Sequence, residues 1–515
     1  MSLLHLIYII AFGSLSLWLL FKDVKDIRKY FGTAFVVSFL AYLGLSLITP
    51  SPLGYTGLVL GLVGLLGGGF VLNIFSNNKI LFVVFLGLAL YGLWMMPSLP
   101  RIPFLFSSNN STENVSSSDL SQLDPNFELL VEVKNGHQIA ELNKIIQKYN
   151  LNYEAAFQVE SGNITDLDDY YAVNIPNEQV KNFDQIIREL QNSGLVDAIE
   201  QNEIVSLAKP IPTTIQSNPA RPGYGVNDPM LEKVWGFDAM KMAELYKLLA
   251  DQKLKPAKRA KIAILDTGVD ANHEDLSANY VSTRSEYDED AHSHGTHCAG
   301  IAAAVSNNKK GIASFAPNNQ FVQVTSIQVF PRRGGTTQRI IINGMILAAD
   351  KGADVLSMSL GGPSSDRAQS AYKDAVNYVN KKGGIVIVAA GNESMDARRI
   401  VPASVDGVIT VSAIDEKFNK AGFSNDVSKI AMGIAAPGVN VYSSVPGSRY
   451  DYMSGTSMAT PYVSGLVGLM KSLKPSLTTE EAFAILNSTG VITQSGNSTG
   501  KLIQPAAAVK RLMNK

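Results

Sequence analysis

Cysteine is nearly absent from this 515-residue chain, and with Cys298 as its single one no intramolecular disulfide can form. This scarcity fits a reducing compartment, and it equally fits an exported bacterial protein that does not use disulfides. Neither sign of charge is in excess, because 44 basic side chains face 45 acidic ones. The charge balance therefore gives no reason to expect nucleic acid or another strongly anionic partner.

Charged residues are also scarce at the start of the chain, where residues 1–106 carry only eight. A buried helical bundle of a soluble domain would show polar helix faces there, and a cleaved signal peptide would explain one apolar run only. Roughly 20 apolar residues span a bilayer. We therefore expect four transmembrane helices within residues 1–100. The apolar runs that form them are 3–21, 31–49, 53–75 and 80–97.

The orientation of these helices follows from the cations between them. Four Lys and Arg side chains lie in the loop 22–29, and Lys79 lies in the short loop before the last run. Because Lys and Arg are enriched in cytoplasmic loops, both loops are expected in the cytoplasm, although Arg101 is one cation on the opposite side. We thus expect a multi-pass cell-membrane protein whose large C-terminal part is extracytoplasmic, either periplasmic or extracellular.

The segment after the membrane region divides into a linker and a small domain. Residues 107–124 are rich in Ser and Asn and predict a flexible linker. Residues 125–208 show strand and helix periodicities in the order strand, helix, strand, strand, helix, strand. This βαββαβ order predicts a ferredoxin-like α+β domain.

The remainder, residues 225–515, has a different pattern. Short runs of apolar β-branched residues alternate with helical stretches, which predicts an α/β fold with a doubly wound parallel sheet. In such sheets the active site forms at the carboxyl ends of the strands. The predicted strands are 261–268, 321–329, 354–360 and 384–392, and the predicted helices begin near 294, 336 and 367.

Three short motifs in this region carry chemistry. Asp266 ends an apolar strand in ILDTGVD, His294 opens a small-residue stretch in SHGTHCAG, and Ser457 stands at a predicted helix start in GTSMATPYVSG. A serine hydroxyl becomes nucleophilic when a histidine takes its proton, and a carboxylate orients that histidine. Each residue alone has a structural explanation, such as a helix N-cap for Ser457. Together, in the order Asp, His, Ser, they predict a catalytic triad.

From about residue 227 to 474 the sequence resembles the subtilisin-like serine proteases (subtilases). The resemblance implies a serine endopeptidase that hydrolyses peptide or protein substrates and needs no cofactor. It also implies that Asn392 helps stabilise the oxyanion. Residues 125–208 resemble the inhibitory propeptide of this family, so we expect the chain to carry its own intramolecular inhibitor and to be made as a zymogen. The segments that would line the substrate pocket are Ser359, Leu360, Gly361 and Ala389, Ala390, Gly391.

Two places in the sequence offer candidate metal ligands. His292, His294 and His297 lie close in sequence, but they lack a carboxylate ligand pattern such as HExxH, so no catalytic metal is expected. Asp275 and the loop 306–311 stand where relatives bind calcium. That loop carries lysines and no carboxylates, so a structural calcium ion stays an open alternative. Cys298 is expected to be a small buried hydrophobic residue.

Two other function classes compete with the protease. One is a catalytically silent subtilase-fold binding module on a membrane anchor, against which the complete triad argues. The other is a transporter or channel with an appended domain. Its spans should carry ionisable residues along a pathway, whereas only His5 lies within an apolar run.

Overall fold

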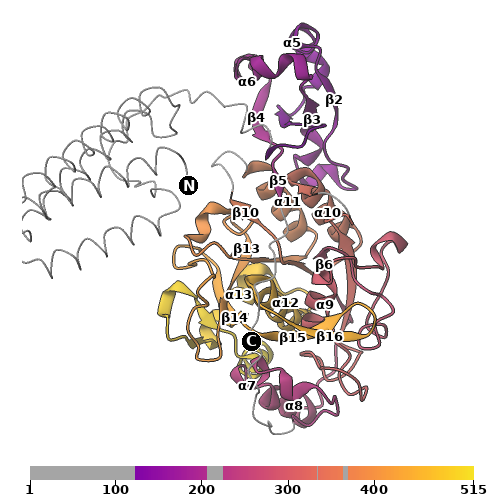
Figure 1. Cartoon of the computed structure of the whole chain (residues 1–515), viewed down its shortest axis with the longest axis vertical. Helices are drawn as coiled ribbons and strands as arrows, with labels where there is room; N and C mark the ends of the chain where they lie inside the picture. Colours follow the sequence, from indigo (N-terminus) through magenta and orange to yellow (C-terminus); the bar gives the residue numbers. More distant parts are fainter. Residues whose placement is uncertain (1–121, 206–223, 333–334, 364–368, 515) are drawn as a thin grey trace, which may run out of the picture. The chain divides into compact units, whose positions relative to one another are not determined.

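The computed structural model describes residues 122–205, 224–332, 335–363 and 369–514 (Figure 1). The four predicted transmembrane helices and most of the predicted linker lie outside these residues. In the part of the chain that is described, no helix combines the length and the apolar character needed to cross a bilayer.

The first described domain, which we call the α+β unit, is a four-stranded antiparallel sheet with two helices. The strand order is β2-β3-β1-β4, which with the chain order βαββαβ is a ferredoxin-like arrangement. Its elements are β1 (Leu129–Val133), α5 (Asn143–Tyr149), β2 (Asn152–Ala155), β3 (Tyr170–Asn174), α6 (Phe183–Asn192) and β4 (Val196–Gln201). The order of strands and helices is the one that the sequence periodicities predict.

The two faces of this sheet bury different partners because successive side chains of a strand point to opposite sides. Leu129 and Val131 of β1 pack with the apolar side of α6, including Ile186. Leu130, between them, belongs instead to a core shared with Ile341 of the following domain. The α+β unit therefore uses one face for its own helices and the other for the large domain.

The large domain is built on an eight-stranded sheet of order β17-β18-β14-β13-β11-β9-β6-β7. All neighbouring strands are parallel except the edge pair of β17 and β18. The predicted parallel sheet is thus found with one antiparallel edge strand. Its strands are β6 (Ala260–Asp266), β7 (Val322–Gln328), β9 (Val355–Met358), β11 (Ile385–Ala389), β13 (Val408–Ile414), β14 (Gly433–Pro437), β17 (Val491–Ile492) and β18 (Lys501–Leu502).

Helices cover both faces of this sheet, as a doubly wound fold requires. Along β6, Ile262 and Ile264 point into one core while Ala263 and Leu265 point into the other. The first core holds α9 (His294–Ala303) and α12 (Thr456–Leu473), and the second holds α10 (Gln338–Asp350) and α11 (Ser370–Lys381). Because the sheet is buried on both faces, only the ends of its strands are available to form a site.

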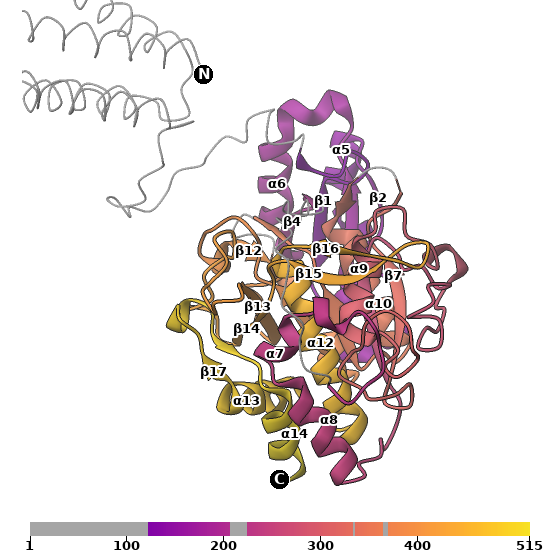
Figure 2. The ribbon, with the colours of Figure 1, turned by 60° about the horizontal axis from the view of Figure 1, so that its bottom comes forward.

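Smaller elements complete the domain. In Figure 2, α8, α13 and α14 lie at the end of the domain remote from the α+β unit. A hairpin of β15 and β16 lies beside α9. The bounds are α7 (Gly236–Ala239), α8 (Met242–Asp251), β10 (Gly362–Pro363), β12 (Ile400–Val401), β15 (Val441–Val445), β16 (Arg449–Met453), α13 (Thr479–Thr489) and α14 (Pro505–Met513).

The closing strand, which the sequence VDAIEQNEIVSL predicts as one segment, is interrupted in the described residues. The chain leaves the sheet after β4, and β5 (Ile204–Val205) pairs antiparallel with β8 (Thr336–Thr337) of the large domain. The break falls at Asn202, whose side-chain amide donates to the Asp124 carboxylate and to the Phe127 carbonyl. These bonds hold Asn202 to the α+β unit while the next residues join the other domain.

Candidate active site

Asp266 and His294 meet at the carboxyl end of the central strand. Asp266 is the last residue of β6, and His294 is the first residue of α9, which the chain reaches after a loop. His294 Nδ1 lies 2.7 and 2.9 Å from the two carboxylate oxygens of Asp266, and the Thr267 backbone N–H donates to the same carboxylate at 2.8 Å. Both side chains are buried. The carboxylate therefore fixes the orientation and the tautomer of the imidazole.

The charge state of His294 is set by competing effects. Burial opposes the charged imidazolium, but the charge and hydrogen bond of Asp266, with the charge of Asp290, outweigh it. The pKa of His294 is therefore raised above its ordinary value. A histidine held this way can take a proton during a reaction and keep it until a leaving group needs it.

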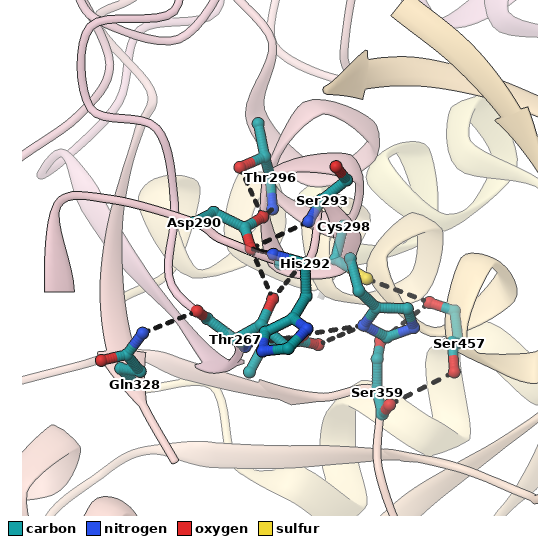
Figure 3. Close-up of polar contacts among 12 residues, drawn as sticks. Thr267, Asp290, His292, Ser293, Thr296, Cys298, Gln328, Ser359 and Ser457 are labelled. Atoms are coloured by element: carbon teal, nitrogen blue, oxygen red, sulfur yellow. Dashed lines mark hydrogen bonds and ion pairs between the residues drawn. The ribbon is translucent and has the colours of Figure 1, made fainter. Parts of the chain in front are cut away.

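Ser457 lies at the start of α12, where a proline shapes its surroundings. Pro461 stands inside this helix, four residues after Ser457, and it has no N–H to donate to the Ser457 carbonyl. That carbonyl instead accepts from the Ser359 hydroxyl at 2.7 Å and from the Cys298 thiol at 3.4 Å (Figure 3). The helix start is thereby tied to the segment after β9 and to α9.

The Ser457 hydroxyl donates to the Ser359 carbonyl at 3.2 Å. The two serines thus exchange hydrogen bonds, each through its hydroxyl and its carbonyl. Catalysis requires the Ser457 hydroxyl to turn toward Nε2 of His294, which breaks its bond to Ser359. Catalytic hydrogen bonds are commonly incomplete before substrate binds.

Asn392 is held beside the same helix start. Its Oδ1 accepts from both the backbone N–H and the hydroxyl of Thr456, each at 2.9 Å. These bonds use the amide oxygen and leave the amide nitrogen to donate elsewhere. An amide donor and the first backbone N–H groups of a helix are the parts from which an oxyanion hole is built.

The two predicted pocket segments follow adjacent parallel strands. Ser359–Leu360–Gly361 comes directly after β9, and Ala390–Gly391 comes directly after Ala389, the last residue of β11. Both segments therefore lie at the carboxyl edge of the sheet. Gly361 and Gly391 have φ of +150° and +97°, in the region where a side chain is strained. A Cβ at Gly391 would lie 2.4 Å from Asn425 Nδ2, so this segment also needs glycine for space.

Cys298 lies beside Asp266 and His294, and it is completely buried. Its sulfur, the His294 ring and the Asp266 carboxylate offer ligand atoms that all lie within 4.8 Å of one another. Burial raises the pKa of the Cys298 thiol well above its ordinary value. The group therefore stays protonated and serves as the small buried hydrophobic residue that the sequence predicts, not as a nucleophile.

The histidine cluster in the sequence does not converge in space. His297 Nε2 faces the backbone carbonyls of Val441 and Asp451, each at 3.1 Å, and burial lowers the pKa of His297 to about 3. His292 is exposed. The three imidazoles therefore do not present one set of ligands to a metal ion.

The calcium alternative can be tested against the groups around Asp275. One carboxylate oxygen of Asp275 accepts from the Asn308 side-chain amide at 2.7 Å, and the other accepts from the Ile312 N–H at 2.8 Å. The Asn308 Oδ1 is used by the Lys310 N–H. The loop thus presents N–H donors to Asp275, and the Asn308 Oδ1 already accepts a hydrogen bond within the loop. As arranged here, these residues do not fit a calcium ion, which needs six to eight oxygen ligands.

Sequence reasoning missed the supports of the triad. Thr456 orients Asn392, and the Ser359 hydroxyl holds the Ser457 carbonyl. Asp290, four residues before the start of α9, accepts hydrogen bonds from the residues around that start. The sequence does indicate one of these supports. Pro461, four residues after Ser457, has no N–H, so the Ser457 carbonyl lacks its helical partner and needs another donor.

Comparison with known proteins agrees with this geometry. Residues 257–504 match the family model described as the subtilase family. Thermitase of Thermoactinomyces vulgaris is 42% identical over 247 residues, which are 47% of this chain and 85% of thermitase. A thermophilic serine proteinase of Bacillus sp. (strain AK1) is 36% identical, and the match covers 57% of this chain and 68% of that proteinase. Subtilisin DY of Bacillus licheniformis is 39% identical over 44% of this chain and 82% of its own.

A single explanation accounts for the strand order, for the position of Asp266, His294 and Ser457 at one sheet edge, and for the extent of these matches. The chain belongs to the subtilase family and is a serine endopeptidase.

Proposed function

We propose that this chain is a membrane-anchored endopeptidase that cuts peptide bonds outside the cytoplasm through an acyl-enzyme on Ser457. The observation that carries the catalytic part is the convergence of the Asp266–His294 pair, the start of α12 and Asn392 at one edge of the sheet. His294 takes the proton of the Ser457 hydroxyl as the oxygen attacks the scissile carbonyl. It then returns the proton to the leaving amine, and a water molecule repeats the sequence to free the enzyme.

The remaining site residues act on the substrate. The Asn392 amide and the Ser457 backbone N–H donate to the oxyanion of the tetrahedral intermediate. Backbone groups of Ser359–Gly361 and Ala389–Gly391 bind the extended substrate as an added strand. Charge that develops on the substrate is thereby met by donors that are already in place, so little reorganisation is needed.

In this proposal the α+β unit is the chain's own inhibitor, a propeptide. The support is the way its last described residues join the large domain. Strand β5 adds to β8 just before α10, and the Glu200 carboxylate accepts from the Ala371 N–H in the first turn of α11 at 2.9 Å. The Asn202 Oδ1 accepts from the Arg339 N–H in the first turn of α10. Two helix starts are thus capped from the α+β unit, which favours a stable complex.

A proton is also shared across this interface. The Tyr170 hydroxyl lies 3.0 Å from both the Glu132 and the Asp374 carboxyl groups, but a phenol can donate only one hydrogen bond. Both contacts are hydrogen bonds only if one carboxyl holds a proton and donates it to the phenol oxygen. Burial raises the pKa of Glu132 to about 7 and also raises that of Asp374. Burial likewise raises the pKa of Glu200 to about 7. The other charged groups acting on this cluster are Asp166, Asp197, Lys373 and Lys381.

We expect the α+β unit to be held less firmly as the pH rises. The folded-state pKa values of Glu132 and Glu200 lie above the ordinary 4.5 of Glu. The stabilisation that these groups contribute is therefore complete below about pH 4.5 and is lost as the pH passes 7. Hydrogen exchange of β1 and β3 amides in the Ser457→Ala chain, corrected for intrinsic rates, should show opening about 1 kcal/mol easier at pH 9 than at pH 6. Glu132→Gln should reduce this difference, whereas Glu178→Gln, at an exposed position, should not. An equal pH dependence in all three chains would contradict the shared proton.

Membrane attachment and orientation are tested with the whole chain in cells. We expect a biotinylated, membrane-impermeant serine-directed phosphonate to label Ser457 in intact cells, and every labelled species that still carries residues 1–100 to fractionate with membranes. The Ser457→Ala chain is the control for specific labelling. Labelling that appears only after permeabilisation would contradict the orientation. A labelled species in the soluble fraction that still carries residues 1–100 would contradict the anchor.

A further inference from the structure

The Asp290 carboxylate is the centre of a hydrogen-bond cluster next to the triad (Figure 3). It receives five hydrogen bonds at 2.7 to 3.0 Å. Every donor is a neutral N–H or O–H group, so the carboxylate can accept all five bonds without holding a proton. The donors are the Thr267 hydroxyl, the backbone N–H groups of His292, Ser293 and Thr296, and the Thr296 hydroxyl.

This cluster replaces an ordinary cap on the helix that carries the catalytic histidine. Ser293 is the N-cap of α9, but its side chain makes no capping bond and its φ is +69°. Asp290 instead accepts from the N–H groups of Ser293 and Thr296, which the first turn leaves without helical partners. The positive end of the helix dipole disfavours an imidazolium at His294, and a carboxylate at this helix start offsets that effect.

The same carboxylate connects this helix start to the triad aspartate. Asp290 accepts from the Thr267 hydroxyl, and that hydroxyl accepts in turn from the Gly295 N–H at 2.9 Å. The Thr267 backbone N–H donates to Asp266. Thr267 thus makes hydrogen bonds both to Asp266 and to the first turn of the helix that carries His294. The space around Gly295 is also closed, because a Cβ there would lie 2.1 Å from the Gly268 carbonyl.

We propose that Asp290 is a positioning residue for catalysis, which acts through Thr267 and the first turn of α9 to hold His294 on Asp266. This role rests on the triad assignment proposed above. Asp290 touches neither the reacting hydroxyl nor the substrate pocket segments in its hydrogen bonds. It acts through the residues that carry His294.

The charge effect has a definite sign. The titratable groups that face His294 are Asp266 on β6, Asp290 before α9, and His297 and Cys298 on α9 itself. Asp266 and Asp290 raise the pKa of His294, whereas burial lowers it. Replacing Asp290 by Asn removes one of the raising charges. The pKa of His294 should fall, and the acidic limb of kcat/KM should move to lower pH.

The test compares wild type, Asp290→Asn and Asp288→Asn as full chains in detergent, with a small peptide substrate and active sites counted by phosphonate titration. Asp288 is a matched control because its carboxylate accepts from the Tyr280 hydroxyl and it is not among the charges that act on His294. In Asp290→Asn, kcat per titrated site should fall about 10- to 100-fold with a smaller change in KM. The acidic limb should shift down by about half a pH unit. Asp288→Asn should match wild type.

Thr267→Val, which removes the bridging hydroxyl at nearly constant volume, gives a second test if Asp290→Asn does not fold. It should lower kcat by itself. Where Asp290→Asn does fold, the double variant should lose no more kcat than the less active of the two single variants. An unchanged acidic limb, or a kcat within twofold of wild type in the variant that folds, would overturn the positioning role. A wild type that is not labelled at Ser457 would instead refute the triad assignment, so the two failures are distinguishable.

Discussion

Ser457→Ala is expected to lower peptide hydrolysis at least about 10⁴-fold while the chain still folds, because the nucleophile is lost and the surrounding donors stay in place. The loss should appear in kcat, since the pocket segments Ser359–Gly361 and Ala389–Gly391 are unchanged. The measurement is steady-state kinetics on the full chain, with circular dichroism to confirm folding. Ser428→Ala, at an exposed position outside the site residues, is the matched control.

The same variant should fail to process itself. The described part of the α+β unit ends with β5 paired to β8 of the large domain. We expect the segment that follows to reach Ser457, where its cleavage gains the advantage of an intramolecular reaction. From the sequence SLAKPIP we expect cleavage after Leu207 or Ala208, because a proline just after the scissile bond is unfavourable. These bonds lie outside the described residues. N-terminal sequencing of wild type and Ser457→Ala side by side will locate the cut. One uncut species in both, with wild type fully active, would contradict self-processing.

Asn392→Ala is expected to lower kcat by about 10²–10³-fold, which is the range known for such an amide in subtilisin and is carried over from it. The loss should leave KM nearly unchanged because the amide binds charge that exists only in the transition state. Thr456 fixes the orientation of the amide through two hydrogen bonds, so the donor needs no rearrangement to act.

Asn392→Asp distinguishes the donor from the mere presence of a side chain. It keeps an oxygen for Thr456 but places a second oxygen where the amide nitrogen would donate, so it should be at least as slow as the alanine variant. Asn272→Ala, an exposed asparagine in the loop after β6, is the control. Wild-type turnover in Asn392→Ala would show that another group holds the oxyanion.

Much of the chemistry is determined by short contiguous stretches of sequence. Asp266, His294 and Ser457 each stand at the junction of a strand or a helix with a loop, and those junctions are readable from apolar runs and turn residues. The βαββαβ order of the α+β unit was readable for the same reason, because its helices and strands show clean periodicities. Local patterns are enough to predict a helix or a strand that buries one of its faces and exposes the other.

Only the tertiary structure decided how these pieces are joined. Ser359 lies 98 residues before Ser457, and nothing local to either serine shows that they exchange hydrogen bonds. The sequence could not show that the closing strand of the α+β unit breaks at Asn202, because the partner that captures β5 is a strand far along the chain. In the sequence, Asp290 is one of several acidic residues in a polar loop. Only the fold places Thr267 and the first turn of α9 around it. Hydrogen bonds between distant segments depend on how those segments pack, and that packing is settled by the whole buried core and not by any local pattern.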